Sequence, residues 1–92
     1  MSASSEGAVE RHVTLPADAA LHARPAGALV REAARHAATI TLVAGARSAD
    51  ARSILQVMAL ALPGGSALVV RAEGEDAETA LDAVVTLLEQ PG

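Results

Sequence analysis

Short stretches of the chain alternate between hydrophobic and polar residues, which is the period expected of a strand with one buried face. Val9, Val13 and Leu15 fall on one side of the first such stretch, and Val13 and Leu15 are its expected core residues. The pattern predicts strands at residues 8–15, 39–43, 46–50 and 67–72. The third of these is short and polar, as expected for a strand at a sheet edge.

Three other stretches carry apolar residues at spacings of three and four, the period of a helix with one buried side. Helices are predicted at residues 21–37, from Ser53 to about Leu62, and from Asp76 to the apolar stripe that ends at Leu88. Pro25 fits only in a first turn and so locates the start of the first helix. Ser53 and Asp76 are the expected N-caps, and Gln56 completes a capping box with Ser53. Pro63 and the two glycines after it should end the second helix.

The resulting order is β-α-β-β-α-β-α, and the 92 residues are enough for one domain. We expect an α+β fold with two layers, one open sheet carrying the helices on one face. Residues 1–7 contain neither a basic nor an apolar segment. They are predicted to form a flexible tail before a single domain at residues 8–92.

Composition narrows the possible functions. The chain is 51% hydrophobic, which is enough for a core, but it has no aromatic residue and no Cys. The lack of Cys excludes disulfides and thiol chemistry and is consistent with a cytoplasmic protein. An acidic chain (net charge −4) without aromatic residues is not expected to bind nucleic acid. Its longest uncharged run is interrupted at Pro63, so no membrane insertion is expected.

The charges are unevenly distributed along the chain. Residues 11–52 hold six Arg and three acidic residues, a local charge of +3, whereas residues 53–92 hold one Arg and six acidic residues. The basic half could therefore face an acidic partner although the whole chain is acidic. The His and acidic residues show no metal-ligand spacing, so neither a metal nor a cofactor is expected.

His22 is the candidate for chemistry among the three histidines, because it lies at the predicted start of a helix. Backbone N–H groups and partial positive charge at such a start favour anions. Arg24 can add charge-assisted hydrogen bonds to phosphate oxygens. A neutral imidazole is also nucleophilic and could hold a phosphoryl group covalently. The alternative is a capping His beside a solvated Arg.

Ser53 also has two interpretations. It can serve only as the cap of its helix, or it can be a phosphorylation site whose phosphate would face Arg52 and the positive end of the helix. The apolar residues that follow it are similarly open to two interpretations, because some must face the core while others could form an exposed patch. These residues are Ile54, Leu55 and Met58.

Three motifs resemble those of one family. Residues 21–26, Leu-His-Ala-Arg-Pro-Ala, resemble the active-centre signature of the HPr family, the histidine-containing phosphocarriers of the phosphoenolpyruvate:sugar phosphotransferase system. Residues 52–60 resemble the family's regulatory-serine segment, and residues 72–76 resemble its entry into the last helix. The three matches occur in the family's order, and the spacing and element order agree with the family from about Ala8 to Gln90, nearly the whole chain. Ala19, Ala20 and Gln56 depart from the usual residues at their positions.

The resemblance implies an open-faced β-sandwich with an antiparallel sheet of strand order 1-4-2-3. It implies that His22 accepts a phosphoryl group on Nδ1 from phospho-enzyme I and passes it to the enzyme IIA domain of a sugar permease, with Arg24 stabilising the group. The protein would then be a carrier within sugar uptake and not an enzyme. The partner-binding residues that it implies are Ala23, Arg31, Arg52, Ile54, Leu55 and Met58.

The resemblance also implies regulation, because in some bacteria an HPr kinase/phosphorylase modifies the family's serine, here Ser53. A second hypothesis is therefore a regulatory module of the same fold, which would bind a transcriptional regulator when Ser53 is phosphorylated. A third is a generic α/β ligand-binding domain, for which the sequence offers no pocket. A monomer is the simplest expectation in each case.

Overall fold

The computed structural model describes residues 8–18 and 23–90, and the side chains of Ala23 and Arg24 lie outside that description. The elements are β1 (Ala8–Thr14), α1 (Ala23–Ala34), β2 (Thr39–Ala44), β3 (Arg47–Asp50), α2 (Ile54–Ala59), β4 (Ala67–Glu73) and α3 (Ala77–Leu88). This is the predicted order of elements. The predicted tail at residues 1–7 falls outside the described residues.

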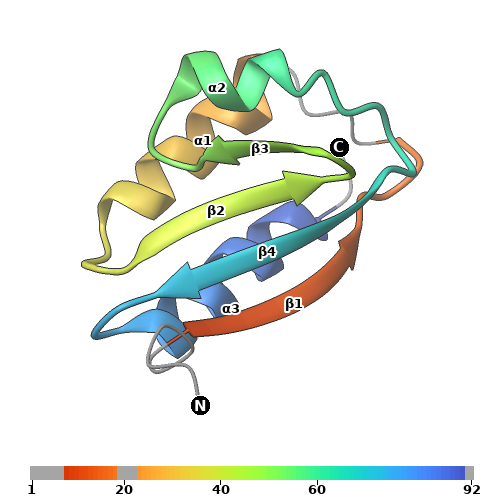
Figure 1. Cartoon of the computed structure of the whole chain (residues 1–92). Coiled ribbons are helices and arrows are strands. Elements are labelled where there is room, and N and C mark those ends of the chain that lie inside the picture. The colour runs from red at the N-terminus through yellow and green to blue at the C-terminus, as the bar shows by residue number, and fades with distance from the viewer. Residues whose placement is uncertain (1–7, 19–22, 91–92) are drawn as a thin grey trace.

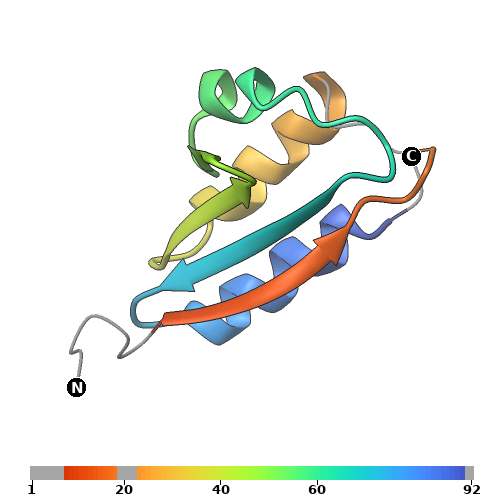
Figure 2. The same ribbon diagram turned by 45° about the vertical axis from the view of Figure 1, so that its right-hand side comes forward.

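The four strands form one antiparallel sheet in the order β1-β4-β2-β3, as the family resemblance implied. Figures 1 and 2 show α1 and α3 covering one face of this sheet, while the other face stays open. The short α2 packs beside α1 and over β3 at one edge. The α+β, open-faced architecture predicted from the sequence is therefore confirmed.

The alternation predicted for β1 determines which face of the sheet is buried. Val13 is 2% exposed and belongs to the core, whereas His12 lies exposed on the open face. In the paired strands, Leu42, Val70 and Ala72 are fully buried on the same side as Val13. The interior holds no aromatic ring, and fully buried alanines, such as Ala26 and Ala33 of α1, fill part of its volume.

Two of the predicted helices are shorter than expected. The first ends at Ala34 and not at residue 37. The second ends at Ala59, three residues before the predicted Leu62, because the chain turns at Ala61. Ala61 has φ = +50°, the left-handed conformation that commonly follows the last helical residues. The helix therefore ends before Pro63, which we had expected to end it.

The start of α3 also differs in part from the prediction. Asp76 occupies the N-cap position, but its side chain makes no capping hydrogen bond to α3. Its carboxylate instead accepts hydrogen bonds from the backbone N–H groups of Ala38 at 2.7 Å and Ala37 at 3.2 Å. Asp76 thereby ties the start of α3 to the connection between α1 and β2.

Candidate functional site

The residue expected to accept the phosphoryl group, His22, lies outside the described residues, as do Ala19 and Ala20. The structure does place the helix that comes directly after it. Ala23 is the first residue of α1, and Pro25 stands in its first turn, as predicted. His22 therefore immediately precedes a helix of 12 residues in the sequence. The first amides of such a helix have no partner within the helix and suit an anion.

Ser53 is the N-cap of α2. Its Oγ accepts a hydrogen bond from the backbone N–H of Gln56 at 3.2 Å, and its backbone is extended. Only this half of the predicted capping box forms. The Gln56 side chain does not return to Ser53, because its Oε1 accepts from the backbone N–H of Asp50 at 2.9 Å. The first turn of α2 is thus tied to the end of β3.

Arg52 points to α1 rather than to the Ser53 hydroxyl. Its Nη2 donates a hydrogen bond to the carbonyl oxygen of His36, beyond the end of α1. Its backbone N–H donates to the Asp50 carboxylate at 2.9 Å. A phosphate on Ser53 would therefore have to compete with the His36 carbonyl for this guanidinium.

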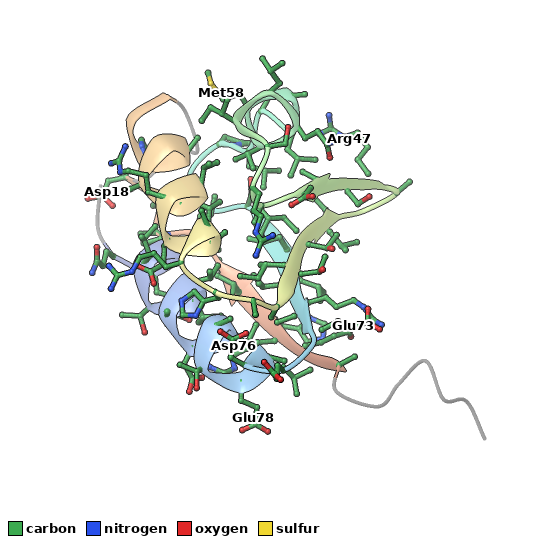
Figure 3. The ribbon with its side chains drawn as sticks, turned by 90° about the vertical axis from the view of Figure 1, so that its left-hand side faces the viewer. Asp18, Arg47, Met58, Glu73, Asp76 and Glu78 are labelled. Carbon is green, nitrogen blue, oxygen red and sulfur yellow. The ribbon has the colours of Figure 1, made fainter. Side chains whose placement is uncertain are left out.

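The expectation that some of the apolar residues Ile54, Leu55 and Met58 face the core is wrong, because Val57 fills that position and all three lie exposed. Leu55 is 80% exposed, Met58 is 41% exposed and Ile54 is 38% exposed, and they are the large hydrophobic residues that the described chain leaves on its surface. Only Val57 of this helix is buried. We call Ile54, Leu55 and Met58 the α2 patch. Figure 3 shows the Met58 side chain pointing outward from α2. Arg31 of α1, also expected to bind partners, is exposed.

His36 has a structural role in the fold. Its ring, largely buried, lies between two carboxylates, with Nε2 3.0 Å from Glu32 Oε2 and Nδ1 3.3 Å from Asp76 Oδ2. Desolvation by itself raises the pKa of Asp76. Its hydrogen bonds from the Ala38 and Ala37 amides and from His36 outweigh that effect and lower the pKa below its ordinary value.

The sequence did not identify two residues that support α2 and the loop after it. Arg47 donates to the carbonyl oxygens of Ala59 and Leu60 at 3.2 and 2.7 Å, and so caps the end of α2. Gly64 lies directly against the backbone that follows β1. A basic residue on the strand before α2 and the Gly-Gly pair were the available signals, but neither specified its contact.

The generic ligand-binding hypothesis would need a pocket or a metal site, and the described part of the chain can be searched for both. It contains no group of three His, Cys or acidic residues that could hold a metal ion. Its shallow surface hollows include one of about 340 Å³ at the start of α3 and one of about 250 Å³ on the open face of the sheet. Neither is lined by Ser53 or the α2 patch. None of the helices described is long and apolar enough to span a membrane.

Comparison with known proteins agrees with the motifs and the fold. Residues 9–90 match the family model described as the PTS HPr component phosphorylation site. The chain is 37% identical over 78 residues to the phosphocarrier protein HPr of Haemophilus influenzae, covering 85% of this chain and 92% of that one. It is also 33% identical over 82 residues to the HPr-like protein Crh of Halalkalibacterium halodurans, covering 89% and 98% of the two chains.

A solved structure gives the same answer. The crystal structure of a phosphocarrier protein HPr from Bacillus anthracis matches this fold with a TM-score of 0.86 and 34% sequence identity. The match covers 91% of this chain and all of the other. Motifs, strand order and these likenesses lead to one conclusion: the chain belongs to the HPr family, whose members carry phosphoryl groups in the phosphotransferase system and are not themselves enzymes.

Proposed function

We propose that the chain accepts a phosphoryl group on His22 from phospho-enzyme I and delivers it to the enzyme IIA domain of a sugar permease. The observation that carries this proposal is the position of His22, directly before Ala23 at the start of α1. The helix amides favour the incoming phosphate, and Arg24, two residues after His22 in the sequence, supplies a cation. We expect this relay to operate in the cytoplasm.

The transfer requires no cofactor. The Nδ1 lone pair of the neutral His22 imidazole attacks phosphorus, and a new N–P bond forms as the donor's bond to phosphorus breaks. The electron pair of the broken bond leaves with the donor group, and His22 keeps its own N–H proton. Transfer to the acceptor domain repeats the exchange in the opposite direction. The two partners supply the rest of the catalytic machinery.

The α2 patch supports the same proposal as a docking surface. Three exposed apolar side chains lie on one short helix that packs beside α1, the helix that follows His22 in the sequence, and we propose that both partners dock on them. Arg31 of α1 and Arg52 add positive charge, which would steer acidic partners. We assign Ala23 to the same surface, because it adjoins His22 in the sequence.

The test is intact-protein mass after incubation with phosphoenolpyruvate and enzyme I. Wild type should gain one acid-labile phosphoryl group, and His22→Ala should gain none. His12→Ala is the matched control, because His12 lies exposed on the open sheet face, and it should be phosphorylated like wild type. Acceptance by His22→Ala would refute the assignment. In Arg24→Ala we expect slower transfer with little loss of stability.

A second candidate function rests on Ser53, since the chain also resembles Crh. Ser53 is partly exposed at the start of α2, next to the α2 patch in the sequence. In this alternative an HPr kinase/phosphorylase would modify Ser53, and a transcriptional regulator would bind the phosphorylated form. Phosphorylation by such an ATP-dependent kinase together with no reaction with enzyme I would favour it.

A further inference from the structure

The helix that carries the α2 patch has little of its own to hold it in place. α2 spans six residues, Ile54–Ala59, and an isolated helix shorter than about 12 residues is marginal in water. Val57 is its buried residue, whereas Leu55 leaves 80% of its surface exposed. The patch side chains therefore add little to the core, and contacts from outside the helix determine where they lie.

The two ends of β3 supply such contacts. At the C-terminal end of α2, Arg47, the first residue of β3, donates from Nη1 to the carbonyl oxygen of Ala59 at 3.2 Å and from Nη2 to that of Leu60 at 2.7 Å. At the N-terminal end, the backbone N–H of Asp50, the last residue of β3, donates to Gln56 Oε1 at 2.9 Å. One strand thus holds both ends of the helix that packs against it (Figure 1).

β3 is a firm support for α2, because the sheet and the core hold it in turn. Ala49 of β3 is 1% exposed and lies opposite Leu42 in the register with β2. Directly after the strand, the backbone N–H of Ala51 donates to the carbonyl oxygen of Ile40 at 2.9 Å, and Ala51 is fully buried. A side chain that binds α2 to β3 therefore binds it to the sheet.

The two side chains that make these bonds, Arg47 and Gln56, are called the α2 anchors here. Both residues are exposed, so neither is needed to fill the core. Each nevertheless makes its hydrogen bonds to a different element from its own, Arg47 from β3 to α2 and Gln56 from α2 to β3. Their bonds therefore act on the local order of α2 more than on the packing of the interior.

We infer that the α2 anchors, Arg47 and Gln56, are positioning residues for partner docking, because they keep the α2 patch in one arrangement before a partner arrives. A helix that frays has to be ordered again on binding, which weakens the complex. The apparent affinity also falls with the fraction of molecules in which the helix is formed. The anchors act on docking and not on phosphoryl exchange, since they hold α2 and not the histidine. The inference rests on the proposed docking of enzyme I at the α2 patch.

The experiment measures the rate of phosphoryl transfer from phospho-enzyme I as a function of carrier concentration. Arg47→Ala removes the bonds at the C-terminal end of α2, and Gln56→Ala removes the bond at its N-terminal end. For each variant we expect KM to rise about threefold or more, with a maximal rate within about twofold of wild type. The double variant should raise KM further than either single change.

Arg11→Ala is the matched control for the loss of charge. Arg11 lies on β1 at the opposite edge of the sheet, where it pairs with Asp82 at 2.9 Å, so its KM should stay near wild type. Gln56→Ala changes no charge at all. High salt screens the pull of an exposed charge, so the ratio of KM in Arg47→Ala to KM in wild type should persist there. A ratio that falls to one in high salt, together with a wild-type KM in Gln56→Ala, would overturn the inference.

Amide hydrogen exchange reports the order of α2 without any partner. The amides of Val57 and Leu60, which bond to the carbonyls of Ser53 and Val57, should exchange several-fold faster in both anchor variants. In Arg11→Ala they should exchange as in wild type. Wild-type exchange in the anchor variants would overturn the inference, and so would faster exchange with an unchanged KM.

Leu55→Ala separates this inference from the proposed function. A wild-type KM in Leu55→Ala would overturn docking at the α2 patch itself. A raised KM there, with wild-type KM in both anchor variants, would overturn only the positioning role. If Arg47→Ala does not fold at room temperature, Gln56→Ala carries the test, because it removes one exposed side chain and a single hydrogen bond. A raised KM in Gln56→Ala then supports the inference, and a wild-type KM overturns it.

Discussion

Replacing Ala61 with Gly should make the protein more stable. Ala61 follows α2 with φ = +50°, and its backbone N–H donates to the carbonyl of Met58 at 3.0 Å. For a residue with a Cβ this left-handed conformation costs about 1–2 kcal/mol, whereas Gly adopts it freely. The Ala61 side chain is exposed, so its removal sacrifices little packing.

The gain is reduced because Gly also has more freedom in the unfolded chain. That entropy costs about 0.5–1 kcal/mol, which leaves a net stabilisation of about 0.5–1 kcal/mol for Ala61→Gly. For a chain of this size the thermal midpoint should then rise by about 2–8 °C. Ala59→Gly is the matched control, because Ala59 is also exposed but still helical. It should lower stability by about 0.5–1 kcal/mol.

Chemical and thermal unfolding followed by far-ultraviolet circular dichroism would measure both variants. Fluorescence is unsuitable, since the chain has no Trp or Tyr. The two Ala→Gly changes should alter the free energy of unfolding with opposite signs, although both remove the same atoms within one short segment, and this contrast is the prediction. A loss of stability in Ala61→Gly as large as that in Ala59→Gly would refute it, because Ala61 would then not occupy the left-handed region in solution.

Three further predictions concern side chains outside the relay. Arg47→Ala should lower the free energy of unfolding by about 1 kcal/mol, measured by urea titration, because two carbonyls at the end of α2 lose their donor. Since hydrogen bonding lowers the pKa of Asp76, its contribution to stability is complete above about pH 4 and is lost as the pH falls through the folded-state value. Urea titrations in acid should therefore show a smaller pH dependence for Asp76→Asn than for wild type. Leu55→Ala should change stability by less than about 0.5 kcal/mol yet weaken binding to enzyme I, measured by calorimetry, whereas Val57→Ala should destabilise the fold.

The sequence was most informative where one local rule acts alone. Alternation identified the buried side of β1, and Pro25 located the start of α1, because each depends only on nearby residues. The strand order came from the family resemblance, because the hydrophobic pattern does not determine which strands pair. The predicted end of α2 was wrong because a residue other than Gly adopts the left-handed conformation, so the breaker that we expected lies farther along the chain.

Side-chain partners were the hardest feature to predict. Asp76 and Gln56 stand where capping rules place them, but each makes hydrogen bonds to a different element. The side chain of a capping residue can accept a hydrogen bond from its own helix or from any other amide that the fold brings near. Only the tertiary structure determines which other amides are near. The same limit applies to Gly64, whose contact with Ala17 depends on how two distant loops meet.

Such contacts also determine whether the arginine side chains behind the local charge of +3 are free or already ordered. The local charge of +3 could have belonged to long, freely moving side chains, which would lose entropy on binding a partner. Arg47 and Arg52 instead donate to carbonyl oxygens at the end of α2 and beyond the end of α1. Their charges are thus already held beside the α2 patch before any partner arrives. An acidic partner that docks on the α2 patch as we propose would meet two arginines that need little further ordering, although the whole chain has a net charge of −4.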